Sequence, residues 1–312
     1  MSEEPRTHNI LVLHPDAESV DRLVESLEER SVRVTVAPDT EVSLAQPFHQ
    51  RFDMILFSDG ISTRQPVEFL RSIKSSPLTR ITPVVTLIGP KNESPTIIAE
   101  WVLQGAETAV PESMNPGDIS DLLKRLLLRF DRERLDPVCI LPSGPVAQSM
   151  LEQMCIHSET SWTLLAVKLL SVQAFNIAYS YDDGDRLLRS FARTLEEVVS
   201  QMGDGLDFTA RLHGSLFCIV TRNRSLDSMC RSILSKTERM IRGFYSAFEL
   251  MKGYLTIEEG AAAGDYHLCE PIIAGLQLPP HWDRNHVYLL DLAEELLADV
   301  LEKEAGFRII SL

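Results

Sequence analysis

The sequence predicts an α/β domain with a doubly wound parallel sheet, followed by an α+β domain. The length of 312 residues exceeds that of one ordinary domain and favours two. Through about residue 130, short apolar runs alternate with amphipathic helical stretches, whereas the order beyond is less regular. Strand–helix repeats with short connections are typical of a parallel sheet with right-handed crossovers, whose functional sites lie at the carboxyl ends of its strands.

Each repeat of the first domain can be placed from its apolar pattern. The expected strands are short apolar or alternating runs at 9–13, 32–36, 54–57, 83–88 and 108–110. The expected helices carry apolar residues at helical spacing over 20–27, 67–73, 97–103 and 116–127. Asn115 can cap the last helix and Pro116 suits its first position. The charged stretch that follows predicts a helical connector at 131–136, which opens the second domain.

The second half predicts a mostly antiparallel sheet with helices packed on it. The expected strands are 162–170, 208–212, 216–220, 254–257, 272–278 and 307–310. The expected long helices are 184–202, 226–244 and 291–303. The strands on either side of His213, Gly214 and Ser215 are expected to form a hairpin.

Composition and charge exclude several classes of function. A net charge of −15 argues against nucleic-acid partners and anionic membrane surfaces, because both bind mainly through Lys and Arg. No apolar run approaches the ~20 residues that cross a bilayer, so no membrane insertion is expected. Residues 1–7 form a polar tail without a signal-peptide pattern, which predicts a cytoplasmic protein. The five scattered cysteines favour reduced, buried thiols over disulfides or a zinc site.

Two short sequence motifs in the first domain match motifs of a known family. Residues 52–56 (FDMIL) and 105–107 (GAE) are common motifs of the receiver domains of two-component response regulators. With the repeated β/α pattern, residues 8–130 therefore resemble a receiver, which has a flavodoxin-like (βα)5 fold. The resemblance implies an Asp that is phosphorylated at the end of the third strand and an acidic pair that holds Mg²⁺. It also implies a Thr and a Lys that contact the phosphoryl group.

None of these residues stands at its position. His14 and Pro15 replace the acidic pair, Ser58 occupies the phosphoacceptor position, Ile88 the Thr position and Glu112 the Lys position. The first domain is therefore expected to be a pseudo-receiver, which still offers faces for docking and dimerisation.

Three polar residues near this pocket have more than one interpretation. Asp16 and Asp59 lie one residue away from functional positions, and such a shift on a strand turns a side chain to the opposite face. We expect both to be solvated loop carboxylates and leave open whether Asp59 can be phosphorylated. His14 is expected to be a surface loop histidine rather than a phosphoryl carrier.

Several short sequence motifs of the second half occur in the same order and at the same spacing as the motifs of another family. They are DP at 136–137, LP at 141–142, GDRLL at 184–188, ARLHGSLF at 210–217, GFY at 243–245, GYL at 253–255, GL at 275–276 and AG at 305–306. On these motifs, residues 131–312 resemble the GGDEF domains of diguanylate cyclases, which have an α+β, nucleotidyl-cyclase-like fold. The resemblance implies a Mg²⁺-dependent enzyme that joins two GTP molecules into cyclic di-GMP across a dimer.

The metal-site acids that the resemblance implies are replaced. The carboxylate of the first strand falls on Lys168, counted back without a gap from Asn176. The signature pentad Gly-Gly-Asp-Glu-Phe corresponds to His213, Gly214, Ser215, Leu216 and Phe217. Because phosphoryl transfer from GTP needs Mg²⁺ to neutralise charge, no metal site and no catalytic residue are expected.

Part of the nucleotide site that the resemblance implies is retained. Asn176 and Asp185 match two residues that hydrogen-bond guanine, and Lys303 matches a phosphate-contacting Lys. The Arg position that follows Lys303 holds Phe307, with Arg308 one step off. In the alternative interpretation both base-binding residues are structural, because Asp185 can cap the long helix and Asn176 can end a short one.

We therefore expect a non-enzymatic bacterial signal-transduction protein, an adaptor that needs no cofactor, binds other signalling proteins and forms a homodimer. The first alternative is a guanine-nucleotide sensor that binds GTP through Asn176 and Asp185. The second, an active diguanylate cyclase, needs carboxylates that the chain lacks at those positions. The feedback site for cyclic di-GMP, Arg-x-x-Asp, maps to Asp204 and Asp207, and an acid at its first position is expected to repel a phosphodiester.

Overall fold

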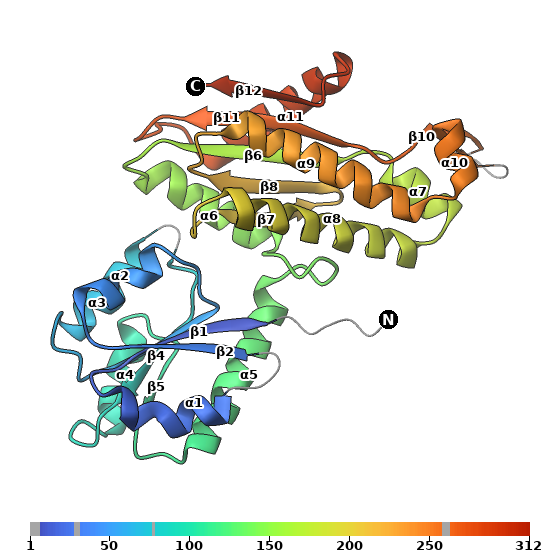
Figure 1. Ribbon diagram of the computed structural model, residues 1–312. Helices are drawn as coiled ribbons and strands as arrows, with labels where there is room; N and C mark the ends of the chain where they lie inside the picture. The colour runs from blue at the N-terminus through green and yellow to red at the C-terminus, as the bar shows by residue number, and fades with distance from the viewer. Residues whose placement is uncertain (1–6, 28–31, 77–78, 258–262) are drawn as a thin grey trace. The chain divides into compact units, whose positions relative to one another are not determined.

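The computed structural model describes residues 7–27, 32–76, 79–257 and 263–312 (Figure 1). Contacts divide the chain between Asp131 and Arg132 into two compact units. This division lies inside the segment 131–136, where the sequence predicts the connector. None of the helices in the described ranges has the length and hydrophobicity that crossing a membrane requires.

The first unit is built on one parallel sheet with the strand order β2-β1-β3-β4-β5 (Figure 1). Its strands are β1 (His8–Leu13), β2 (Val32–Ala37), β3 (Met54–Ser58), β4 (Val84–Ile88) and β5 (Thr108–Pro111). This is the doubly wound order of flavodoxin-like proteins, so the fold expected for the first domain is confirmed.

Helices connect these strands on both faces of the sheet. They are η1 (Ala17–Val20), α1 (Asp21–Leu27), α2 (Glu41–Ala45), η2 (Gln46–Phe48), α3 (Pro66–Ser75), α4 (Pro95–Leu103) and α5 (Pro116–Arg134). The sequence patterns missed α2, which begins where the Thr40 side chain accepts a hydrogen bond from the Ser43 amide. A helix of this length is too short to show a helical period.

Both faces of the parallel sheet are buried. Ile10 and Val12 of β1 belong to the apolar cluster under α1 and α5, whereas Leu11 and Leu13 belong to the cluster under α2, α3 and α4. Alternate residues of a strand point to opposite faces. The two-sided burial therefore explains why these strands are continuous apolar runs in the sequence.

The second unit carries a five-stranded sheet with the order β12-β11-β6-β8-β7. Its strands are β6 (Trp162–Leu169), β7 (Phe208–His213), β8 (Leu216–Thr221), β11 (Pro271–Leu278) and β12 (Phe307–Ser311). Neighbours are antiparallel except for the parallel pair of β11 and β12. A separate antiparallel pair consists of β9 (Tyr254–Ile257) and β10 (Gly264–His267). The mostly antiparallel α+β architecture expected from the sequence is confirmed.

Helices cover the two faces of this sheet, with α8 and α9 on one face and α6 and α11 on the other (Figure 1). The helices are α6 (Gly144–His157), α7 (Val172–Ala178), α8 (Tyr181–Met202), α9 (Leu226–Ile241), η3 (Arg242–Phe244), α10 (Ala247–Lys252) and α11 (His286–Glu302). Phe175, Phe191 and Phe217 belong to the buried apolar cluster of this unit. All five cysteines are buried and free, in agreement with the expected reduced thiols.

The sequence patterns also missed α6. Its buried residues Ala147, Met150, Leu151 and Met154 recur at helical spacing, and Pro145 stands in its first turn. The signal was therefore present in the sequence, unlike that of α2.

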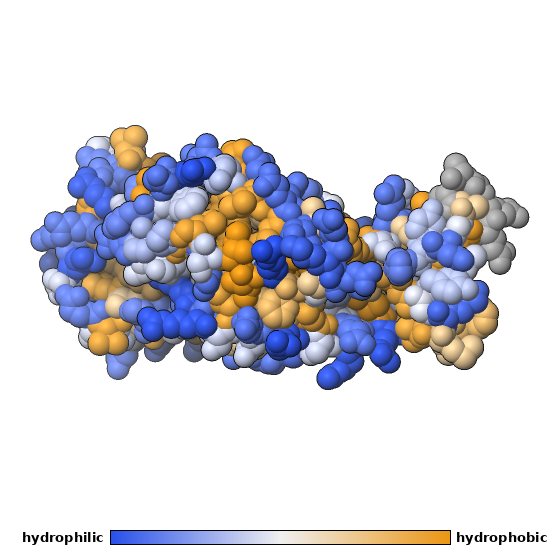
Figure 2. Space-filling model, turned by 90° about the horizontal axis from the view of Figure 1, so that it is seen from above, coloured by the Kyte–Doolittle hydropathy of each residue, from blue (hydrophilic) through white to orange (hydrophobic). Residues whose placement is uncertain are grey.

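β12 forms one edge of the second sheet, and its outer side pairs with no strand of the described residues. Phe307, Ile309 and Ile310 of this strand are only half-buried. Figure 2 views the molecule from the side on which β12 lies in Figure 1 and shows apolar residues gathered in the middle of that view. An apolar edge strand with free N–H and C=O groups can pair with another chain.

Candidate functional site

The two positions that the resemblance assigns to metal-binding acids lie side by side. Lys168 of β6 and Leu216 of β8 are paired directly opposite each other in the antiparallel ladder. Residues paired in this way have Cβ atoms about 4.5–5.5 Å apart. The pairing across the sheet thus brings together the same two positions that the count along the sequence selects.

Neither of these side chains can bind Mg²⁺. Lys168 is exposed and carries an ammonium group, while Leu216 is buried. Mg²⁺ takes oxygen ligands and is repelled by a cation. Over the described ranges, no group of three or more His, Cys, Asp or Glu side chains is arranged to hold a metal ion.

The hairpin between β7 and β8 is held by the loop that opens the second unit. Arg211 donates from Nε to the carbonyl of Gly214 at 2.8 Å and from Nη1 to Oδ1 of Asp136 at 2.9 Å. The same Asp136 oxygen accepts the backbone N–H groups of Val138 and Cys139. Gly214 has a φ of 53°, a left-handed conformation that favours glycine. The turn therefore keeps its shape although its acids are gone.

The first and last residues of the pentad, His213 and Phe217, contact other side chains of the second unit. His213 lies 3.6 Å from the carboxylate of Glu294 on α11, and both side chains are mostly exposed. Phe217 is fully buried and meets Phe191 edge to face at 5.1 Å. The surviving phenylalanine thus belongs to the core.

Asn176 and Asp185 come together around Gly184. A Cβ added at Gly184 would lie 1.7 Å from Oδ1 of Asn176, so the amide packs directly on the glycine backbone. Oδ1 of Asn176 is buried and accepts no hydrogen bond from the described residues. Asp185 is half-buried one residue further along, with no hydrogen bond or ion pair to the described residues. These are two polar groups without protein partners.

The interpretation of Asp185 as a helix cap is wrong. α8 begins one turn earlier, at Ser180, whose hydroxyl accepts a hydrogen bond from the Asp183 amide. Asp185 lies inside the helix because Tyr181, Asp182 and Asp183 already adopt helical geometry. Asn176 does lie in the last turn of the short helix α7.

Lys303 and Arg308 share one carboxylate. Nζ of Lys303 lies 2.5 Å from Oδ1 of Asp299, and Arg308 pairs with Oδ2 of the same residue. Hydrogen bonds from Lys303 and Arg308 lower the pKa of Asp299. Phe307, at the family's Arg position, packs against the core instead. A phosphate would therefore compete with Asp299 for Lys303.

Asp207 of the expected feedback site is a structural residue. It is 6% exposed and accepts hydrogen bonds from the hydroxyl of Thr221 at 2.6 Å and the amide of Arg222 at 3.3 Å. Burial, with a smaller contribution from nearby Asp204, raises the pKa of Asp207 to about 6. The carboxyl group is thus engaged inside the protein.

In the first unit, three replaced positions form one hydrogen-bonded network. Glu112 Oε1 lies 3.0 Å from Nε2 of His14 and accepts the hydroxyl of Ser58 at 3.1 Å. Burial opposes protonation of His14, but hydrogen bonds to Glu112 and the Asp16 carbonyl raise the pKa of His14 above its ordinary value. The hydrogen bond with His14 lowers the pKa of Glu112. The contact and the directions of both pKa shifts favour an ion pair between His14 and Glu112.

Two expectations for this pocket are wrong. His14 is 4% exposed rather than a surface residue, because its ring is bonded on both sides, to Glu112 and to the Asp16 backbone. Asp59 is half-buried and accepts hydrogen bonds from the Gly89 amide and the Asn92 side chain, so it is not a freely solvated carboxylate. Asp16 is exposed, as expected, and caps η1.

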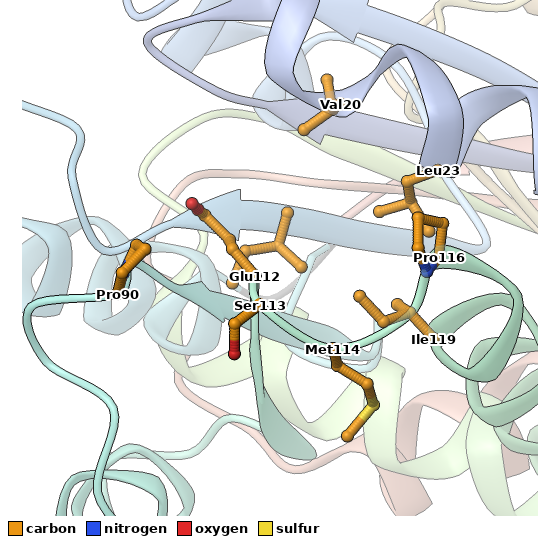
Figure 3. Close-up of a pocket in the computed structure, with 9 residues that line it drawn as sticks. Val20, Leu23, Pro90, Glu112, Ser113, Met114, Pro116 and Ile119 are labelled. Atoms are coloured by element: carbon orange, nitrogen blue, oxygen red, sulfur yellow. The ribbon is translucent and has the colours of Figure 1, made fainter.

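Beside Glu112 lies a mostly apolar hollow of about 230 Å³. Val20 and Leu23 come to it from the first helical segment, and Met114 and Ile119 from the segment after β5 (Figure 3). No cation lines this hollow in the described structure. It offers no Lys in the position from which a receiver contacts its phosphoryl group.

Comparison with known proteins agrees with this description of the two units. Residues 135–268 match the family model of the diguanylate cyclase GGDEF domain. Curated protein sequences give no significant match.

Several solved structures are similar to one unit or the other. The coiled coil and GGDEF domain of DgcB from Caulobacter crescentus, in complex with c-di-GMP, is 14% identical, with 62% of this chain and 94% of that chain covered and a TM-score of 0.44. Diguanylate cyclase SiaD of Pseudomonas aeruginosa, in complex with its activator SiaC, is 16% identical over 62% and 70% of the chains, with a TM-score of 0.42. Chemotaxis response regulator CheY4 of Vibrio cholerae is 21% identical over 38% and 98%, with a TM-score of 0.35. The family match and the sheet orders together identify residues 135–268 as part of a GGDEF domain that follows a unit with the receiver fold.

Proposed function

We propose that this chain is a non-enzymatic protein of cyclic di-GMP signalling, in which a pseudo-receiver and a degenerate GGDEF domain serve as docking surfaces. The observation that carries the proposal is the pairing of Lys168 with Leu216. These are the positions at which an active enzyme needs two carboxylates. An ammonium group stands at one position and an isobutyl group at the other, and neither can be a ligand of the metal ion.

The loss of Mg²⁺ removes the reaction itself. Attack of a 3′-hydroxyl on GTP requires a cation that neutralises the triphosphate and stabilises the transition state. Lys168 brings one positive charge, but it cannot bridge phosphate oxygens and activate the hydroxyl as a divalent ion does.

In this proposal the first unit cannot be phosphorylated at Ser58 either. A phosphoryl group on Ser58 would face the carboxylate of Glu112, which is 3.1 Å from the hydroxyl oxygen. Like charges at this distance repel, and no acidic pair is present to hold Mg²⁺. The proposal therefore includes a first unit that acts without phosphorylation.

Docking of another chain is supported by the outer edge of β12. Its half-buried Phe307, Ile309 and Ile310 stand next to unpaired backbone groups. We propose that a second copy of this chain or another signalling protein covers this edge in the cytoplasm.

Incubation of the full chain with GTP and Mg²⁺, followed by chromatography, tests the absence of catalysis. We expect no cyclic di-GMP from the wild type. Light scattering of an Ile310→Lys variant tests the edge, because a charge at this half-buried position outside the core cluster is expected to weaken self-association. Product formation would refute the proposal, and a wild-type monomer would refute the homodimer.

A second candidate function is a GTP sensor, and one specific observation favours it. The buried oxygen of Asn176 and the carboxylate of Asp185 have no partner in the described residues. A guanine edge offers two N–H donors to a carboxylate, and an amide can donate and accept. Lys303 would then contact the phosphates after release from Asp299.

Calorimetry with GTP in the absence of metal separates the sensor from the plain adaptor. Asp185→Ala should abolish the binding heat, whereas Asp182→Ala, at an exposed position of the same helix, should leave it unchanged. Absence of heat in the wild type would remove the sensor and keep the adaptor.

A further inference from the structure

A second hollow of the first unit, of about 420 Å³, lies on the side of the sheet away from Ser58. Asp59 follows β3 directly, and Asn92 lies in the loop after β4, so the hollow opens at the carboxyl ends of two parallel strands. Ligands of doubly wound sheets bind at this edge. The volume is within the range of small-molecule sites.

The Asp59 carboxylate lines this hollow and is held by two hydrogen bonds. Its Oδ1 accepts the Gly89 amide at 2.9 Å, and its Oδ2 accepts the side-chain amide of Asn92 at 2.8 Å. A carboxylate has about four acceptor sites, so each oxygen keeps one for a ligand. The two hydrogen bonds hold the group in one orientation, which lowers the entropic cost of binding a ligand.

The walls of the hollow are apolar and aromatic. Trp101 of α4 lines it and is itself held by Phe57, edge to face at 5.6 Å. Val67 of α3 and Ile97 of α4 complete the apolar lining. An indole beside a fixed carboxylate is a combination that attracts organic cations.

The charged side chains that line the hollow are all acidic. Its charged lining residues are Asp59 and Glu100, and no Lys, Arg or His of the described residues lines it. Arg71 lies close by, but it is engaged with Gln104 through two hydrogen bonds of 2.8 and 3.2 Å. The hollow therefore lacks an internal counter-ion for its carboxylates.

We propose that this hollow binds a small organic cation, a guanidinium group on a short apolar stem. The planar guanidinium donates two parallel hydrogen bonds to Asp59, and Glu100 adds a second negative charge at the rim. The stem packs on Trp101, Val67 and Ile97. This site depends neither on phosphorylation nor on the second unit.

Titration of the full chain with n-butylguanidinium tests the site, followed through the indole N–H resonance of Trp101 in a nitrogen-15 spectrum. We expect saturable binding in the millimolar range, which is normal for a ligand of this size. n-Butylurea has the same shape without the charge and is expected not to bind. Equal binding of the urea, or no saturable shift with the guanidinium, would overturn the proposal.

Three variants locate the interaction. Asp59→Asn should weaken binding about tenfold or more, because a charged hydrogen bond is lost while the Asn92 amide can turn to bond the new side chain. Glu100→Gln, at an exposed position that folding does not need, should weaken it about twofold. Glu68→Gln changes an exposed carboxylate of α3 outside the hollow and should have no effect. Unchanged affinity in both Asp59→Asn and Glu100→Gln would refute the proposal.

A blocked arginine, N-acetyl-arginine methylamide, distinguishes two sources of the same chemistry. Tighter binding of the blocked arginine than of n-butylguanidinium would assign the hollow to an arginine side chain of a protein partner. The opposite order would assign it to a free small molecule, and failure of both probes would overturn the cation site.

Discussion

The two units differ in what surrounds the residues that stand at the expected catalytic positions. In the first unit, His14, Ser58 and Glu112 satisfy one another in a closed network at the former phosphorylation site. In the second unit, Lys168 and Leu216 lie opposite each other and form no such network in the described structure, and Oδ1 of Asn176 is buried with no hydrogen-bond partner among the described residues. The polar side chains of the first group thus bond one another, whereas those of the second group do not.

This difference indicates where a ligand can still act. A ligand gains little from polar groups that already bond each other, because binding must first break those bonds. Buried groups without partners gain the full value of a new hydrogen bond. The network of His14, Ser58 and Glu112 is therefore expected to stabilise the first unit, whereas Asn176 and Asp185 are the groups at which a ligand could gain a new hydrogen bond.

The largest effect is expected when the closed network is broken. Glu112→Ala leaves buried His14 and Ser58 without their shared acceptor and should destabilise the first unit by about 3 kcal/mol. Native-state hydrogen exchange of the amides in β1 and β3 measures this locally. Glu68→Ala, at an exposed position, is the control. Equal protection in the two variants would show that the network is not stabilising.

A pH effect of similar size, with a definite sign, is expected in the second unit. Because the pKa of Asp207 is about 6 in the folded state and 3.8 for an ordinary Asp side chain, folding favours the protonated form. The stability of this unit should therefore fall by up to about 3 kcal/mol as the pH rises from about 4 to 7. Asp207→Asn should remove this slope in denaturant unfolding.

The first unit is expected to be most stable between the lowered pKa of Glu112 and the raised pKa of His14. The contribution of His14 is present at low pH and disappears above its raised pKa, while that of Glu112 disappears below its lowered pKa. Hydrogen exchange of the β1 amides measures this profile, and protection that increases as the pH rises through the pKa of His14 would contradict the contribution of His14.

A moderate effect is expected where Asn176 packs on Gly184. Gly184→Ala places a Cβ 1.7 Å from the amide oxygen of Asn176 and must displace that side chain. We expect a loss of about 1–3 kcal/mol in stability, as for overpacked sites, together with loss of any GTP binding. Gly243→Ala, where nothing lies within 4 Å of the new Cβ, is the matched control. Calorimetry and thermal unfolding of both variants check this.

The smallest effect is expected at Lys168, which stands where the resemblance implies a metal-binding acid. Lys168 is exposed, so Lys168→Ala should change the unfolding free energy by no more than about 0.5 kcal/mol. Thermal unfolding measures it. A larger loss would mean that Lys168 has a structural partner.

Most helices and strands could be predicted from the sequence, because a long element repeats its apolar residues often enough for the period to be detected. Strands buried on both faces, such as β1 and β3, appear as continuous apolar runs, and α8 and α9 carry apolar stripes of more than three turns. α2 has a single turn and no period to detect. The start of α8 was placed too late because Ser180 and Asp185 are both residues that cap helices well.

The sequence by itself determined which residues stand at the positions that the two resemblances assign to catalysis, because a Lys, Leu or Ser in place of an acid is visible in the sequence alone. Only the tertiary structure decided what the replacements do. His14 and Glu112 are 98 residues apart, and nothing local predicts that they form an ion pair. Likewise, the packing of Asn176 on Gly184 and the hollow around Asp59 depend on contacts between separate helices and loops. Local sequence fixes the chemistry of a side chain, whereas burial and partners, which set its pKa and availability, are properties of the assembled fold.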